Sequence, residues 1–116
     1  MKHQGSCHCG RVAFEVEGEI TAGLSCNCSI CQRRGSVLWF VPRAQVRMKT
    51  PESDLQTYTF NKHRIQHHFC GVCGCAPFSE ALAPATGEMG AAVNLRCVDD
   101  VDFASLTIKH FDGRSL

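Results

Sequence analysis

The feature that most constrains this chain is the spacing of its cysteines. Nine of the 116 residues are cysteines, and seven of them fall into Cys-x-Cys, Cys-x-Cys-x-x-Cys and Cys-x-x-Cys groups. Cysteines two or three positions apart close loops that are too tight for ordinary disulfides, but they place their sulfurs well for a metal ion. The odd count, and an N-terminus without an export-signal pattern, also oppose a disulfide framework. We therefore interpret the cysteines as metal ligands and expect a cytoplasmic protein.

Two of the cysteine groups are pairs that lie far apart in the sequence. Cys7 and Cys9 occur in SCHCG, and Cys70 and Cys73 occur in FCGVCG, where a glycine follows each cysteine. Glycine allows the tight turns in which backbone amides point toward sulfur. Two such pairs together form the closed tetrahedral four-thiolate site that is typical of structural zinc. The alternative, four free buried cysteines, is the weaker interpretation.

The third group lies in the stretch LSCNCSICQRRGS and contains three cysteines, Cys26, Cys28 and Cys31. An ion with three protein ligands and one open position is the arrangement of a catalytic zinc. An ion held from a single loop is also lost more readily, so this second zinc can be substoichiometric. The alternative is a closed site with a fourth ligand from elsewhere in the chain. The candidates for that ligand are Cys75, Cys97, His63, His67 and His68.

The charge of a three-thiolate site indicates what it could do. Three thiolates leave zinc a weak Lewis acid, poorly suited to acidifying water, whereas a thiol is a suitable soft fourth ligand. A free thiol is only about 3% ionised at pH 7, and zinc deprotonates it on binding. Arg33 and Arg34 follow directly and could hold the carboxylates of a thiol peptide by bidentate hydrogen bonds. Alternatively, they are solvated surface arginines on a short helix.

Hydrophobic periodicity predicts a mainly β domain of short strands with metal-binding loops. Most apolar residues alternate with polar ones, and only two segments suggest otherwise: a helical turn over residues 29–34 and a helical or turn-like segment over residues 99–105. The first of these would begin with Ser29 as N-cap and end at Gly35. Trp39 and Phe40 could line a pocket, but burial in a strand core is the favoured interpretation of both. The predicted strands cover residues 11–17, 37–41, 55–60, 91–97 and 106–111.

Four segments resemble the family of the glutathione-dependent formaldehyde-activating enzyme and centromere protein V. They begin with GSCHCG and the nearby FEV, and continue with CNCSICQRRGS, FCGVCGCAPF and VNLRCVDDVD, in the family order. The resemblance spans residues 4–111 and implies the all-β fold called a β-tent, here with short antiparallel strands. It implies a structural zinc on Cys7, Cys9, Cys70 and Cys73 and a catalytic zinc on Cys26, Cys28 and Cys31. Its founding member is a carbon–sulfur lyase that joins formaldehyde to glutathione as S-hydroxymethylglutathione.

The leading hypothesis from the sequence is therefore a zinc-dependent carbon–sulfur lyase formed by one domain, residues 1–116, with two zinc ions per chain. Its expected partners are glutathione or another small thiol and a small aldehyde such as formaldehyde. The alternatives are a non-catalytic zinc-stabilised binding module and a thiol or metal sensor. A formal net charge of +1 makes a nucleic-acid partner unlikely on electrostatic grounds. No apolar run is long enough to span a membrane.

Overall fold

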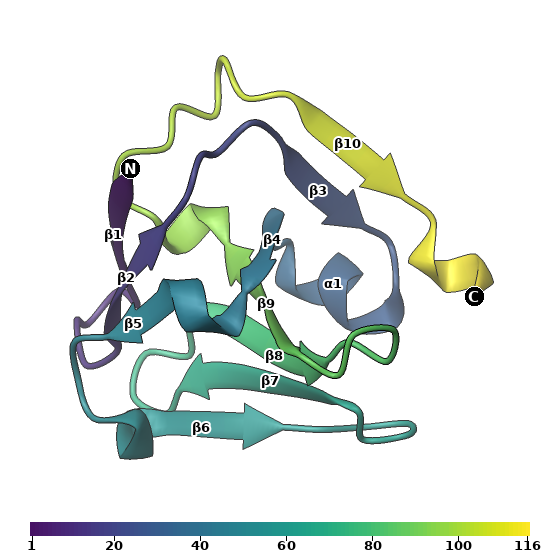
Figure 1. Cartoon of the computed structure of the whole chain (residues 1–116), viewed down its shortest axis with the longest axis horizontal. Coiled ribbons are helices and arrows are strands. Elements are labelled where there is room, and N and C mark those ends of the chain that lie inside the picture. Colours follow the sequence, from purple (N-terminus) through teal and green to yellow (C-terminus); the bar gives the residue numbers. More distant parts are fainter.

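The computed structural model describes all residues from 1 to 116 and consists mainly of short strands (Figure 1). In chain order the strands are β1 Lys2–Ser6, β2 Ala13–Glu17, β3 Gly23–Cys26, β4 Leu38–Pro42, β5 Val46–Met48, β6 Leu55–Tyr58, β7 Ile65–Cys70, β8 Phe78–Leu82, β9 Met89–Asn94 and β10 Ile108–Phe111. The single α-helix is α1, Ser29–Arg34. Four 3₁₀ turns cover Arg43–Gln45, Glu52–Asp54, Leu95–Cys97 and Gly113–Ser115. The predicted mainly β class is confirmed.

The strands form two sheets. The small sheet has the order β1-β2-β5, and the large sheet has the order β10-β3-β4-β9-β8-β7-β6. Every pairing is antiparallel except that of β3 with β10, which is parallel. β3 joins β4 through one residue pair, Leu24 opposite Leu38. The pairing that joins β3 and β10 to the rest of the large sheet is therefore short. Figure 1 shows these two strands apart from β6, β7 and β8, with α1 between them.

The hydrophobic core lies between one face of the large sheet and the small sheet. Phe14 and Val16 from β2 and Val46 from β5 contribute one side of it. From the large sheet come Trp39 and Val41 on β4, Ala91 and Val93 on β9, and Phe78 on β8. These residues occupy alternate strand positions, as expected for strands that bury one face. The intervening positions of β4, β8 and β9 face the opposite side of the large sheet.

Several predicted boundaries are corrected. The residue that caps α1 is Cys28, not Ser29, and it makes no side-chain capping bond. The strand predicted over residues 91–97 ends at Asn94, because the chain turns into a 3₁₀ turn in which the Asn94 side chain accepts from the Arg96 N–H. Gly35 ends α1 in the left-handed region, at φ 69°, as predicted. Residues 99–105 contain turns without a helix.

Five strands had no sequence prediction, namely β1, β3, β5, β7 and β8. β7, IQHHFC, carries adjacent histidines that hide its alternation, and β3, GLSC, has only four residues. Such segments become strands because neighbouring strands pair with them. Their own local sequence pattern does not identify them as strands. The structure contains no helix that is long and apolar enough to cross a membrane.

Candidate metal centres and the adjoining cavity

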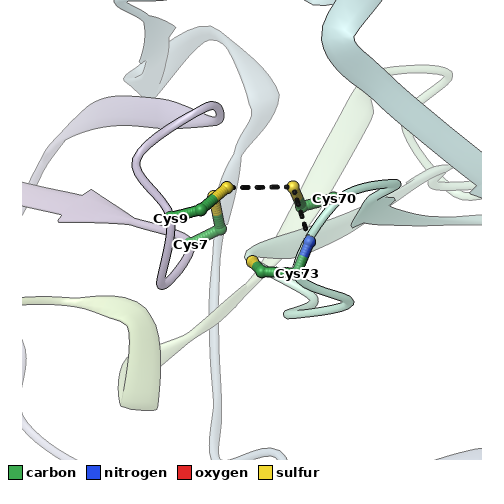
Figure 2. Close-up of side chains that lie close together, drawn as sticks. All are labelled: Cys7, Cys9, Cys70 and Cys73. Carbon is green, nitrogen blue, oxygen red and sulfur yellow. Dashed lines mark hydrogen bonds between the residues drawn. The ribbon is translucent and has the colours of Figure 1, made fainter.

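Four cysteines from two distant segments meet at one point, and we call them the outer group: Cys7, Cys9, Cys70 and Cys73 (Figure 2). Cys7 and Cys9 lie in the loop after β1, whereas Cys70 ends β7 and Cys73 lies in the turn that follows. Sγ of Cys9 is 3.7 Å from Sγ of Cys7 and 3.6 Å from Sγ of Cys70. Four thiolates arranged tetrahedrally about zinc, each at about 2.3 Å, lie about 3.8 Å apart. The outer group therefore fits a four-thiolate zinc site.

Backbone amides point at the sulfurs of the outer group. Val12 N–H donates to Sγ of Cys7 at 3.3 Å, and the N–H groups of Val72 and Cys73 donate to Sγ of Cys70 at 3.4 and 3.5 Å. The N–H groups of Cys73 and Val72 lower the pKa of Cys70. The N–H of Cys75, followed by that of Cys9, lowers the pKa of Cys73 to about 5. These two sulfurs are thus prepared as thiolates.

Cys9 behaves in the opposite way. A backbone hydrogen bond from Arg11 favours its thiolate, but desolvation and the sulfurs of Cys70 and Cys7 outweigh it, so that the pKa of Cys9 rises to about 11. Cys9 therefore resists ionisation beside two thiols, Cys70 and Cys73, whose pKa values are lowered. The donor set therefore requires a cation to become fully ionised, which is what zinc supplies in such sites.

Three cysteines form the inner group, Cys26, Cys28 and Cys31, whose sulfurs all lie within 4.8 Å of one another. Cys26 ends β3, Cys28 caps α1, and Cys31 lies in the first turn of α1. Burial raises the pKa of Cys31 to about 12, followed by the effect of the neighbouring Cys28 sulfur. Burial also opposes ionisation of Cys28, but the N–H and sulfur of Cys31, with other hydrogen bonds, outweigh it and lower its pKa. This set, too, fits a thiophilic cation.

None of the proposed fourth ligands joins the inner group. Cys75 packs against the outer group. Burial raises the pKa of Cys97 to about 12, and the charges of Cys75, Cys7 and Cys73 raise it further, so Cys97 also lies near the outer group. His68 hydrogen-bonds Thr57 and Glu80, and His63 hydrogen-bonds Thr59. No histidine, aspartate, glutamate or further cysteine completes the inner set within 4.8 Å. The inner group thus contains three residues that could hold a metal ion, with no fourth such side chain among them.

The C-terminal segment lies against the inner group, which the sequence did not predict. The side chain of Asn27 donates to Asp112 Oδ1 at 2.9 Å and accepts from the Arg114 N–H at 2.9 Å. Gly113 is so close that a Cβ there would lie 2.6 Å from Sγ of Cys26. Glycine is therefore required for this approach. The Cys-Asn-Cys pattern gave no signal of it, because the partners are separated by more than eighty residues.

A cavity of about 770 Å³ opens beside the inner group, and all three inner cysteines line it. Of the two arginines, Arg34 lines the cavity, whereas Arg33 does not and instead donates from Nη1 to the Ser29 carbonyl at 2.9 Å. Phe40 also lines the cavity and is 63% exposed, so the predicted burial of Phe40 in the core is wrong. Trp39 is 8% exposed within the core, as predicted.

His67 is the one histidine on the cavity wall. Its ring stacks on Phe60 at a centroid distance of 5.3 Å. Burial lowers the pKa of His67, and the positive charges of Arg34 and His68 lower it further. The ring is therefore neutral at pH 7, and Arg34 is the cation that faces the cavity near it. Sequence reasoning had considered His67 only as a metal ligand.

A charged network supports the sheet that forms the cavity floor. Glu80 accepts from Arg43 Nε at 2.8 Å and lies 2.8 Å from His68 Nε2. His68 Nδ1 is 2.9 Å from the hydroxyl of Thr57, and its ring contacts Phe78 edge to face. Every buried polar side-chain atom has a partner. These contacts tie β6, β7 and β8 together and hold the floor rigid.

Comparison with known proteins adds two findings. The model of the family described as glutathione-dependent formaldehyde-activating enzyme matches residues 2–111. Among solved structures, a crystal structure of a Rhodobacter sphaeroides protein from structural genomics superposes with a TM-score of 0.76 at 27% sequence identity. That match covers 94% of this chain and 100% of the Rhodobacter chain.

Proposed function

Since the chain belongs to the family of glutathione-dependent formaldehyde-activating enzymes, we propose that it is a zinc-dependent carbon–sulfur lyase. It binds glutathione at the inner group and adds the glutathione sulfur reversibly to formaldehyde, giving S-hydroxymethylglutathione. The observation that carries this proposal is the inner group itself, three cysteines without a fourth protein ligand, on the wall of a cavity of about 770 Å³. A site completed by protein would have no position for a substrate thiol.

Each metal centre has its own ligands in this proposal. Cys7, Cys9, Cys70 and Cys73 hold a structural zinc, and Cys26, Cys28 and Cys31 hold the zinc of the reaction site. When bound at the inner group, zinc supplies the positive charge that keeps an incoming thiol in its thiolate form. The chain supplies the remaining requirements, which are a cation for the thiol peptide (Arg34) and a largely apolar cavity wall with a neutral histidine.

Arg34 is the residue that orients the thiol peptide. It lines the cavity one turn after Cys31 and can pair with a glutathione carboxylate through two parallel hydrogen bonds. The neutral ring of His67 adds no charge that would compete with this pairing. In the reaction a carbon–sulfur bond forms between the thiol sulfur and the aldehyde carbon. The carbonyl oxygen takes up the proton that the thiol gave up, so that no other reactant is needed.

The first experiment measures zinc per chain with and without glutathione, in the intact protein and in Cys28→Ser. We expect up to two ions in the intact protein, one in the variant, and a glutathione-dependent change in the zinc-edge X-ray absorption of the intact protein only. Cys75→Ser is the matched control, because Cys75 belongs to neither group. One ion in every sample, with a spectrum indifferent to glutathione, would overturn the proposal. Assays of S-hydroxymethylglutathione formation then follow on the same samples.

A further inference from the structure

The side of the cavity away from the inner group is an apolar trough in the large sheet. Its floor is formed by small residues that are register neighbours, since Ser79 lies opposite Ala92 and Ala81 lies opposite Gly90. The flanking strands supply large apolar residues at positions on the same face, with Ile65 opposite Ala81 and Phe40 opposite Ala92. Leu82 and Met89 form a cross-strand pair at the end, at the alternate positions that belong to the core face of the sheet. All these residues line the cavity.

Large apolar side chains on the trough face are exposed. Five of the protein's nine exposed large hydrophobic side chains line the cavity, and two of these, Phe40 and Ile65, lie on the face of the trough. Phe40 is 63% exposed and Ile65 is 45% exposed. Scattered exposed hydrophobic residues are ordinary, but a contiguous set around a hollow marks a surface that binds apolar groups.

Formaldehyde and glutathione do not account for this surface. Formaldehyde has two heavy atoms and fills only a small part of a cavity of about 770 Å³. Glutathione is a charged peptide with two carboxylates, and Arg34 is the one arginine or lysine on a cavity wall on which 19 of 29 residues are hydrophobic. Binding charged groups along the trough would remove them from water without partners. The trough thus lacks an occupant in the reaction with formaldehyde.

We propose that the trough binds the hydrocarbon chain of a larger aldehyde, an alkyl or arylalkyl aldehyde whose carbonyl carbon reacts beside the inner group. This inference rests on the proposed function and names its substrate class. The thiol adds as before. One carbon–sulfur bond forms, the carbon–oxygen double bond becomes a single bond, and the thiol proton is transferred to the oxygen. The product is a thiohemiacetal whose chain lies over Gly90 and Ala92, between Phe40 and Ile65.

The first test is a binding measurement that needs no turnover. S-hexylglutathione and S-methylglutathione share the peptide and differ by five methylenes, each worth up to about fourfold in affinity if fully buried. By calorimetry we expect the hexyl compound to bind at least about tenfold more tightly. Equal affinities of the two compounds would overturn the proposal.

Two kinds of variant localise the effect. Gly90→Ile fills the floor, and it is expected to fold because a Cβ at Gly90 meets no atom closer than 3.8 Å and β-branched residues suit strands. It should reduce the hexyl-to-methyl ratio to below about threefold, whereas Gly90→Ala, which adds one carbon, should have a smaller effect. Phe40→Ala combined with Ile65→Ala removes the exposed wall residues and should also lower the ratio. A ratio unchanged in both kinds of variant would place the alkyl chain elsewhere and overturn the proposal.

The second test compares formaldehyde, butanal and hexanal as substrates with glutathione. We expect kcat/KM to rise with chain length and the hexanal-to-formaldehyde ratio to fall in Gly90→Ile. Turnover of formaldehyde alone leaves the proposed function intact and overturns the assignment of the trough. Tight hexyl binding without turnover of any aldehyde contradicts the lyase reaction but supports the trough. If Phe40→Ala with Ile65→Ala instead converts a dimer to a monomer and leaves ligand affinity unchanged, the trough is a contact between copies of the chain.

Discussion

At the scale of single residues, neighbouring side chains of one type have different roles. Arg33 and Arg34 are adjacent in α1, and the helical rotation between them directs the first back to the Ser29 carbonyl and the second to the cavity wall. The guanidinium of Arg34 also lies 5.9 Å from the centre of the Phe69 ring. In the sequence, both arginines were equal candidates for binding a thiol-peptide carboxylate. Only the direction of each side chain in the structure distinguishes Arg34 from Arg33.

We expect Arg34→Ala to raise KM for glutathione by about tenfold or more, because a hydrogen bond to a charged group contributes about 1.5–3 kcal/mol. kcat should change less, since Arg34 orients the peptide and does not touch the reacting sulfur. Arg33→Ala is the matched control and should leave KM within about twofold. Steady-state kinetics with varied glutathione measures both. Equal effects of the two substitutions would contradict the assignment.

We expect NMR titration of the His67 ring to give a midpoint below the ordinary histidine pKa of about 6.5, because burial and then Arg34 lower its pKa. In Arg34→Ala the midpoint should move up, and in Arg33→Ala it should stay. Since the folded-state pKa lies below that of the unfolded chain, the contribution of His67 to stability is present above pH 6.5 and decreases as the pH falls below it. His67→Gln should therefore flatten the dependence of the free energy of unfolding on pH in that range. A midpoint above 6.5 would contradict the electrostatic assignment.

At the scale of elements, the inner group depends on the last strand of the chain. β10 pairs with β3 in parallel, with Phe111 opposite Cys26, and the following 3₁₀ turn brings Gly113 against the Cys26 sulfur. Asn27, between two of the inner cysteines, holds this turn through both atoms of its amide. The inner loop and the C-terminal turn thus form one unit.

We expect Asn27→Ala to release this turn, because it removes two hydrogen bonds that contribute about 1 kcal/mol each. Amide hydrogen exchange of Arg114 should accelerate, and the inner group should lose metal at a lower chelator concentration than in the intact protein. Ser105→Ala is the control, since it removes an exposed hydrogen bond to Asp102 away from the site. Unchanged exchange at Arg114 would show that the turn is held by other contacts.

At the scale of the whole molecule, the outer group connects the two sheets. Cys7 and Cys9 follow β1 of the small sheet, and Cys70 and Cys73 lie at the end of β7 in the large sheet (Figure 2). A metal ion at this point restricts two segments that are separated by about sixty residues, and structural zinc contributes about 10–16 kcal/mol in small zinc peptides. That is comparable to the whole stability of a typical domain, about 5–15 kcal/mol.

We therefore expect Cys70→Ser to reduce the unfolding temperature far more than Cys28→Ser, because only the first removes a link between the sheets. Calorimetric unfolding of both variants, with metal content measured on the same samples, makes the comparison. A zinc chelator should reproduce the effect of Cys70→Ser in the intact protein. Equal unfolding temperatures for the two variants would contradict a structural role for the outer group.

The sequence by itself determined the mainly β class, the family and the division of seven cysteines into two groups. Spacing carried this information, because a thiol pair two or three positions apart suits a metal whatever the rest of the fold. Alternation likewise located β2 and β6, and a continuous apolar run ended by Pro42 located β4. The proposed zinc ions and their ligand roles remain predictions.

Only the tertiary structure decided which residues surround the inner group. Phe40 is hydrophobic and lies in an apolar run, so its local pattern matched that of Trp39, yet alternate strand positions place one on the cavity wall and the other in the core. Asn27, Gly113 and the trough over Gly90 and Ala92 arise from contacts between distant segments. The physical reason is that a cavity is bounded by strands paired across the sheet, and that pairing is not encoded in any single stretch of the chain.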